Sequence, residues 1–378
     1  MNSRERLIRT FMGEEVDRIP ISLYEFDGFY DGWIYNYPEY VEILDYARGK
    51  TDKMYFWRPE RPAGEEILFY GVVESGSIRR IEWNDGDCKY VKTIIETPRG
   101  KLTSVSKRMR GIHTSWTVEH LCKDERDAEK VLSLPYEPWR PSVDSFFILD
   151  ERLGDSGIVM GDIPDALCLT VELFGLSRFI RIYMRNKALI FDLLEFFQER
   201  IRNYLRHLLS NGAITLYRIV GPEYATPPFL NPREFDRLVT SYDAELIDLL
   251  HSYGGLARLH SHGKVKRVLQ SFREMRIDAT DPLEPPPDGD VNLREAREIL
   301  GDEVTLIGNI EERIFEVGDK TDIERWVRRA VEEASDGRFI LCPTAMPLTT
   351  PLSQKVKENI IHYIDCGLKY GDLGRKRE

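Results

Sequence analysis

Cysteine is scarce in this chain, and its spacing limits what the chain can be. The 378 residues include five cysteines, Cys88, Cys122, Cys168, Cys342 and Cys366, and no two of them form a Cys-x-x-Cys pair. An odd number of scattered cysteines argues against a disulfide framework and favours a reducing compartment. We therefore expect a cytoplasmic protein.

The sequence also lacks long apolar runs and an excess of positive charge. Residues 1–18 alternate charged and apolar residues and contain no apolar core of a signal peptide. No window approaches the roughly 18 apolar residues of a membrane span. The net charge is −11, and no basic stripe with interleaved aromatics is visible. We expect a small-molecule substrate, without nucleic acid or membrane as a partner.

What the sequence does contain is a long alternation of strand and helix patterns. A first strand is predicted near Ile21, and six more follow from residue 158 onward. They cover Ile158–Gly161, Ala213–Val220, Leu256–His260, Ile277–Thr280, Val304–Gly308 and Phe339–Cys342. Helical patterns lie between them, at Val171–Ile182, Lys187–Leu209, Pro232–Tyr253, Lys264–Met275, Leu293–Leu300, Asp322–Ala334 and Gln354–Leu368.

This alternation predicts a parallel sheet, because each parallel strand needs a crossover helix to return the chain. With seven strands predicted, a (β/α)8 TIM barrel is the first choice and an open doubly wound sheet the second. No Gly-x-Gly-x-x-Gly follows the first strand, which weakens a dinucleotide-binding sheet. Residues 67–107 alternate in the manner of antiparallel hairpins and predict a β insertion within a single domain that spans residues 1–378.

In a barrel the carboxyl ends of the strands meet at one mouth, so polar residues there predict the site. His260 and His262 follow one strand directly. With Glu223 and Asp281 they are the candidate catalytic residues, as acids and bases. The candidate substrate-binding residues are Tyr24, Glu25, Asp27, Asp162, Tyr224, Glu284 and Asn309.

The two histidines allow two interpretations. The strand runs into Gly263, where the backbone can turn and bring both rings to one metal, with Cys342 as a third ligand. Zinc prefers such imidazole and thiolate ligands. Equally, the pair can orient a substrate through hydrogen bonds, and this spacing alone does not decide between the two.

Several segments together resemble the uroporphyrinogen decarboxylase superfamily. They are RERLIRTFMGEEVDRIP, GLARLHSHGKV, IDATDPLEPP, VTLIGNIEE and FILCPTAMPLTTPL, and the resemblance extends from about Arg4 to Asp365. It implies a (β/α)8 barrel with the site at the strand ends, and related barrels suggest a homodimer. The superfamily also contains methyltransferases that act with a corrinoid or a corrinoid protein. Their zinc site is a His-x-Cys pair and a later cysteine, whereas here His262 stands where the first cysteine is expected.

The true decarboxylase has an arginine-rich segment near its N-terminus that grips the carboxylates of a porphyrin precursor. Between Arg18 and Arg48 this chain has no arginine or lysine. The chain is therefore expected to lie nearer the methyltransferases. Three hypotheses remain: a methyltransferase-like enzyme with a corrinoid or other methyl donor, a decarboxylase acting on a small carboxylic acid or tetrapyrrole, and a non-enzymatic binding partner of a corrinoid or tetrapyrrole protein.

Overall fold

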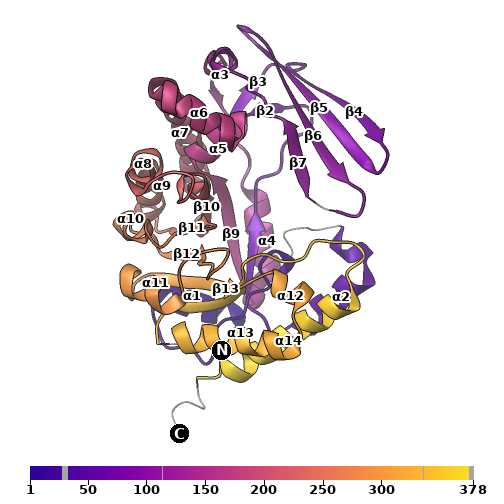
Figure 1. The fold of residues 1–378 in the computed structure, drawn as a ribbon, viewed down its shortest axis with the longest axis vertical. Helices are drawn as coiled ribbons and strands as arrows, with labels where there is room; N and C mark the ends of the chain where they lie inside the picture. The colour runs from indigo at the N-terminus through magenta and orange to yellow at the C-terminus, as the bar shows by residue number, and fades with distance from the viewer. Residues whose placement is uncertain (28–32, 113, 335, 374–378) are drawn as a thin grey trace. The chain divides into compact units, whose positions relative to one another are not determined.

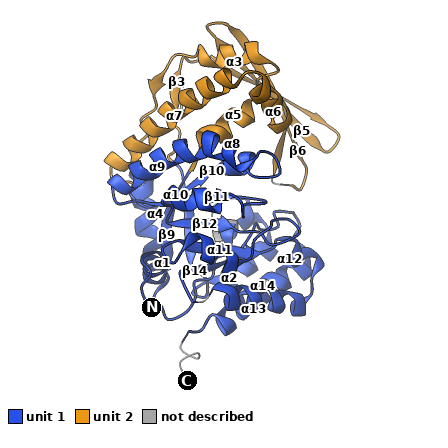
Figure 2. Cartoon of the chain, turned by 60° about the vertical axis from the view of Figure 1, so that its left-hand side comes forward, with its two compact units in different colours: residues 1–58, 144–162, 214–378 blue, residues 59–143, 163–213 orange. Residues whose placement is uncertain are grey.

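The computed structural model describes residues 1–27, 33–112, 114–334 and 336–373, and the chain within these ranges forms two compact units. Unit 1 consists of residues 1–58, 144–162 and 214–378, and unit 2 of residues 59–143 and 163–213. Figure 2 colours the two units separately. Each is described by itself below.

A parallel sheet of seven strands forms the centre of unit 1. In spatial order its strands are β1 (Lys53–Trp57), β9 (Gly157–Pro164), β10 (Leu216–Val220), β11 (Leu256–Ser261), β12 (Ala279–Pro282), β13 (Thr305–Ile310) and β14 (Phe339–Pro343). From β9 to β14 the order of the strands in the sheet is the same as their order in the chain. This is expected where crossover helices connect neighbouring parallel strands. The predicted strands from Ile158 onward are thereby confirmed, whereas β1 was missed by the sequence analysis.

Residues near Ile21 close this sheet into a barrel. Ile21 pairs in parallel with Leu341 of β14, and the N–H of Ser22 donates to the Leu341 carbonyl at 2.9 Å. On its other side, the carbonyl of Ile21 accepts from the N–H of Asp52, next to β1, at 2.7 Å. The short first strand therefore bridges the two edges, and the predicted TIM-barrel-like α/β fold is confirmed.

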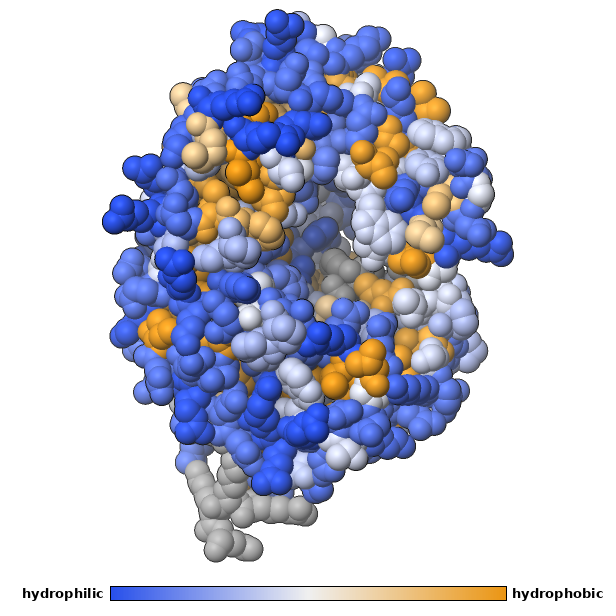
Figure 3. Space-filling view, viewed as in Figure 1, coloured by the Kyte–Doolittle hydropathy of each residue, from blue (hydrophilic) through white to orange (hydrophobic). Residues whose placement is uncertain are grey.

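Helices surround the barrel strands (Figure 1). They are α1 (Ser3–Met12), α2 (Pro38–Ala47), α4 (Asp144–Leu153), α8 (Pro232–Phe235), α9 (Ser241–Ser252), α10 (Leu269–Glu274), α11 (Leu293–Leu300), α12 (Arg313–Val317), α13 (Lys320–Ala334) and α14 (Gln354–Tyr370). The predicted helix over Pro232–Tyr253 is interrupted, because residues 236–240 form a π-helical turn between α8 and α9. The face of the molecule shown in Figure 3 is largely hydrophilic, with apolar residues scattered over it.

Unit 2 combines antiparallel strands with helices. One sheet contains β4 (Ile78–Asp85), β5 (Cys88–Thr97), β6 (Gly100–Met109) and β7 (Ser115–Glu119), and a smaller one contains β2 (Glu66–Leu68), β3 (Gly71–Val73) and β8 (Glu137–Pro138). The helices are α3 (Glu125–Leu132), α5 (Ala166–Phe174), α6 (Leu176–Arg185) and α7 (Lys187–Ser210).

One helix prediction in unit 2 was wrong. The segment Val171–Ile182 is not a single helix, because the chain breaks at Gly175 between α5 and α6. Gly175 has φ of 74°, a backbone conformation that residues with a side chain rarely adopt. A Cβ atom at this position would also lie 2.5 Å from Nε2 of His120. The glycine therefore sets the direction in which α6 begins.

A membrane-spanning helix would need length and apolar character together. No helix in the described parts of the chain combines the two.

Asp52 fixes the closing strand from within unit 1. Its side chain is fully buried and accepts hydrogen bonds from Arg6 and Arg18, both at 2.6 Å, and from the N–H of Ile21 at 2.9 Å. The carboxylate therefore pairs with two guanidinium groups, of which Arg6 also pairs with Asp17 at 2.7 Å, and it holds the backbone of the bridging segment.

We expect Asp52→Asn to lower the free energy of unfolding by about 3 kcal/mol, because it leaves Arg18 without its counter-charge and the buried Arg6 with only the exposed Asp17. Urea denaturation followed by circular dichroism measures this change. The control is Asp45→Asn, which removes an exposed pair with Arg48 and should change stability by less than about 1 kcal/mol. Equal effects of the two substitutions would contradict the role given to Asp52.

Candidate active site at the strand ends of the barrel

Buried charged side chains converge inside the barrel at β10, β11 and β12. Arg258 and His260 are two residues apart on β11 and so point to the same side of the sheet. Arg218 of β10 is in register with Arg258, and Asp281 of β12 is in register with His260. Residues in register on neighbouring strands share a face, so these four side chains form one cluster.

Asp281 holds two members of this cluster. Its carboxylate accepts from Nε and Nη2 of Arg258 at 2.6 and 2.7 Å, and it lies 2.7 Å from Nδ1 of His260. Burial would raise the pKa of Asp281, but Arg258 and His260 outweigh burial and hold that pKa well below its usual range. The carboxylate is therefore ionised and can only accept, so Nδ1 of His260 carries the proton.

His260 is a neutral base in this arrangement. Burial lowers the pKa of its imidazole, and the opposing effect of Asp281 only partly compensates. Nε2 makes no hydrogen bond with any of the described residues. The ring of Tyr24 stacks beside that of His260, with 6.3 Å between centroids. The unprotonated Nε2 is thus the basic atom of the site.

A second histidine–carboxylate pair lies next to the first. Nδ1 of His262 is 2.7 Å from a carboxylate oxygen of Glu284, whose other oxygen accepts from the N–H of Gly263 at 2.6 Å. Burial alone would lower the pKa of His262, but the hydrogen bond and charge of Glu284 outweigh it and raise the pKa. The rings of His260 and His262 are 4.7 Å apart. A base and a proton donor are therefore neighbours.

The remaining interior cation is Arg218. Its Nε donates to Asp162 at 2.7 Å and its Nη1 to the hydroxyl of Tyr24 at 2.6 Å, and Asp162 also pairs with Arg58. Asp162 is fully buried as a side chain. Its carboxylate therefore pairs with and positions Arg218, and Arg218 and Tyr24 can bind an anionic group.

The other predicted site residues lie at different depths. Glu223 and Tyr224 are half-buried in the turn Pro222–Ala225, and Glu223 accepts from the N–H of Gly221 at 3.1 Å. Asn309 is fully buried on β13 and donates to the carbonyl of Leu283 at 3.0 Å. The side chains of Glu25 and Asp27 lie outside the described part of the structure.

Sequence reasoning missed Arg218 and Arg258. Both stand in otherwise apolar strand sequences, LYRIV and LARLHS. The available signal was a charged residue inside an apolar strand, and on β11 also the spacing of two between Arg258 and His260, because side chains alternate between the two faces of a sheet. The interior therefore contains guanidinium groups beside the histidines and carboxylates.

The residues of the predicted zinc site do not fit a three-ligand metal. In the described parts of the chain no group of three His, Cys, Asp or Glu side chains could hold a metal ion. Nδ1 of each histidine is engaged by a carboxylate, which leaves Nε2 as the ring nitrogen open to a ligand. Cys342 is buried on β14 and contributes to no such group with His260 and His262. The three predicted ligands therefore do not come together as one metal-binding group.

Comparison with known proteins gives one family. A sequence model described as uroporphyrinogen decarboxylase (URO-D) matches residues 117–356. No curated protein matches the sequence.

Among solved structures, a methyltransferase from Methanosarcina mazei is similar with a TM-score of 0.61 and 14% identity, covering 98% of this chain and 99% of that chain. A B12-independent methionine synthase from a Shewanella species has a TM-score of 0.41 and 12% identity, covering 76% of this chain and 75% of that chain. At such identity the first of these similarities supports the fold.

Glu311, at the end of β13, gives a prediction about pH. Burial and the neighbouring carboxylates of Glu284 and Asp288 raise its pKa to about 7. The folded state therefore keeps a proton that the unfolded chain releases near pH 4.5, and stability falls as pH rises from about 4.5 to 7.

We expect Glu311→Gln to remove this loss, so that the variant gains about 2 kcal/mol relative to the parent between pH 5 and pH 8. Urea denaturation at both pH values measures the difference. Glu316→Gln, at an exposed position of α12, is the control and should show no such trend. A parallel pH dependence of the Glu311 variant and the parent would contradict the raised pKa.

Proposed function

Since this chain belongs to the uroporphyrinogen decarboxylase family, we propose that it is a methyltransferase-like enzyme of that family whose acceptor is a small anionic molecule. The observation that carries this proposal is the orientation of His260. Asp281 fixes the proton on Nδ1, burial keeps the ring neutral, and Nε2 stays unbonded beside Tyr24.

Each residue has a part in the proposed reaction. Arg218 and the hydroxyl of Tyr24, 2.6 Å apart, bind the anionic group of the acceptor. The thiol or hydroxyl of the acceptor gives its proton to Nε2 of His260. The resulting anion attacks the methyl carbon, and the electron pair of the broken bond stays with the donor. The positive charge that forms on His260 is stabilised by Asp281.

The donor in this proposal is a corrinoid or another activated methyl compound. The described residues at the centre of the site include the charged or polar side chains of Arg218, His260 and Glu284. A corrinoid, free or on a partner protein, is treated as an external reactant.

A second candidate, a carboxy-lyase, is favoured by one observation. The raised pKa of His262 makes it a proton donor next to the acceptor site. In that reaction Arg218 holds a substrate carboxylate, carbon dioxide leaves, and the carbanion takes the proton from His262. The third hypothesis, a non-enzymatic binding protein, requires that His260 can be replaced without loss of function.

One assay separates these candidates. Methyl-labelled methylcobalamin is incubated with the protein and a panel of small thiols and phenols, each with and without a carboxylate, and the methylated product is measured. Release of labelled carbon dioxide is followed in parallel from carboxyl-labelled acids. Methyl transfer that prefers the carboxylate-bearing acceptors supports the first candidate, and carbon dioxide release supports the second.

We expect His260→Gln to lower kcat by roughly 10²- to 10⁴-fold, because it removes the base. His251→Gln is a matched control, since His251 also contacts a carboxylate, Asp278, at 2.8 Å, but lies on helix α9 rather than at the strand ends. It should leave kcat within about twofold of the parent. Similar losses in both variants would show that the effect comes from stability and not from catalysis.

Removal of metals should leave methyl transfer unchanged. The protein is treated with a chelator, metal content is verified by mass spectrometry, and the rate is compared with that of untreated protein. A rate that disappears with the metal and returns with added zinc would contradict the role of His260 as the activating base.

A further inference from the structure

Unit 2 contains a hollow with an unusual charge. Its volume is about 470 Å³, and it is lined by Lys123, Asp124, Glu125, Arg126, Arg178, Arg181, Ile182 and Arg185. Five of these eight side chains are cationic, although the whole chain has a net charge of −11. An adjoining hollow of about 360 Å³ shares Lys123, Arg178 and Arg181 with the first. Because they share this wall of α6, we call the two hollows together the α6 groove.

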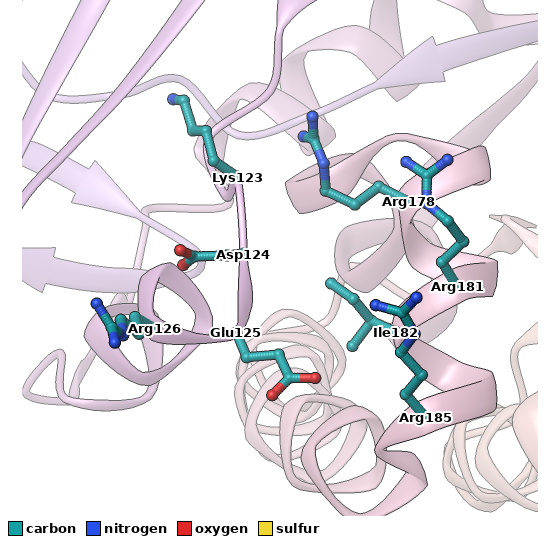
Figure 4. Close-up of a pocket in the computed structure, with 8 residues that line it drawn as sticks. All are labelled: Lys123, Asp124, Glu125, Arg126, Arg178, Arg181, Ile182 and Arg185. Atoms are coloured by element: carbon teal, nitrogen blue, oxygen red, sulfur yellow. The ribbon is translucent and has the colours of Figure 1, made fainter.

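One wall of the α6 groove is a row of arginines. Arg178, Arg181 and Arg185 are spaced by three and four residues on α6, so they share one face of the helix. Figure 4 shows these side chains and Ile182 on the same helix, with the carboxylate of Glu125 turned toward α6 and Arg126 turned away from it. The wall formed by α6 thus carries three guanidinium groups, and Glu125 supplies the carboxylate that is turned toward it.

These arginines differ in how they are held. Nη1 of Arg178 donates to the carbonyls of Cys122 at 3.0 Å and Phe174 at 3.4 Å, which fixes the guanidinium at the rim. Arg181 and Arg185 have neither a hydrogen bond nor an ion pair with any described residue. Two guanidinium groups therefore keep all their donors available, and guanidinium forks bind phosphate and carboxylate oxygens in pairs.

The start of α6 adds to the positive potential of the α6 groove. Gly175 precedes the helix and provides no side-chain acceptor for its first N–H groups. Those groups, with the partial positive charge of a helix N-terminus, are directed to the end of the groove where Ser177 and Arg178 lie. The cationic side chains and the helix terminus thus favour the same kind of ligand.

We propose that the α6 groove is a binding site for a small anion with several negative charges, of the phosphate-ester or polycarboxylate class. A single negative charge would leave the arginine row mostly unpaired, whereas a ligand with two charged groups can contact both Arg181 and Arg185. The apolar side chain of Ile182 lies between them on the same wall.

The test uses isothermal titration calorimetry at low salt, with inorganic pyrophosphate and citrate as probes and acetate as the monovalent control. We expect binding of pyrophosphate, citrate or both, and much weaker binding of acetate. The double variant Arg181→Gln with Arg185→Gln should weaken binding of the multivalent probes by about tenfold or more. Both arginines are exposed, so the variant should keep the parent's circular dichroism spectrum and melting temperature.

A charge-matched control removes two exposed arginines of unit 2 that do not line the groove, Arg110→Gln with Arg206→Gln. It should change the affinity by less than about twofold. Hydrogen exchange supplies a second measurement, because the bound probe should protect residues 175–185 in the parent and not in the Arg181 and Arg185 variant.

Two results would overturn the proposal. One is the absence of binding of both multivalent probes to the parent at millimolar concentration. The other is equal weakening by the groove variant and by the charge-matched control, which would mean that the anions respond only to net charge. Tighter binding of pyrophosphate than of citrate would support the phosphate class, and the reverse order would support the polycarboxylate class.

Discussion

The chemistry of the barrel interior depends on the carboxylate of Asp281. It accepts two hydrogen bonds from Arg258 and one from His260, and all three side chains are buried. Buried charges are tolerated only where counter-charges and hydrogen bonds compensate the lost hydration. Asp281 provides both for Arg258, and in doing so it fixes the tautomer of His260. Asp281 thus both compensates the buried charge of Arg258 and leaves Nε2 of His260 as the unprotonated nitrogen.

The two histidines show how burial sets opposite roles for one residue type. Each gives Nδ1 to a carboxylate at 2.7 Å. The side chain of His260 is 8% exposed and shares Asp281 with an arginine, whereas that of His262 is 40% exposed and has Glu284 without such competition. Desolvation therefore dominates at His260 and lowers its pKa, while the carboxylate dominates at His262 and raises it. Acid and base differ in surroundings, not in side chain.

The barrel and the position of His260 could be predicted from the sequence. The barrel follows from strand patterns of four to eight residues between helical ones, and the position of His260 follows from the end of such a strand. Strand β1 was missed because it has only five residues, KMYFW, and is followed by β2 rather than by a helix, so it stands outside the strand–helix alternation. The helix break at Gly175 depends on contact with His120, 55 positions earlier in the chain, and no local pattern reveals such contacts.

The predicted zinc site illustrates a different limit. The sequence shows which side chains could ligate a metal, but not which of their atoms are already engaged. Asp281 and Glu284 are 21 and 22 residues from the histidines that they contact. Only the register of β11 against β12 brings Asp281 to His260. The same register produces a carboxylate–imidazole pair and so fixes Nε2 as the nitrogen of His260 that is open to a ligand.

Charge in the barrel interior also bears on the size of the substrate. The sequence offered no arginine or lysine between Arg18 and Arg48, but β10 and β11 bring Arg218 and Arg258 into the interior. Each of these buried guanidinium groups is paired with one carboxylate, Asp162 or Asp281, whereas Arg58, which also pairs with Asp162, is 59% exposed. These buried cations are therefore already matched by buried carboxylates. A porphyrin precursor with many carboxylates would need a cation for each of them, and the described residues of the interior offer no such surplus.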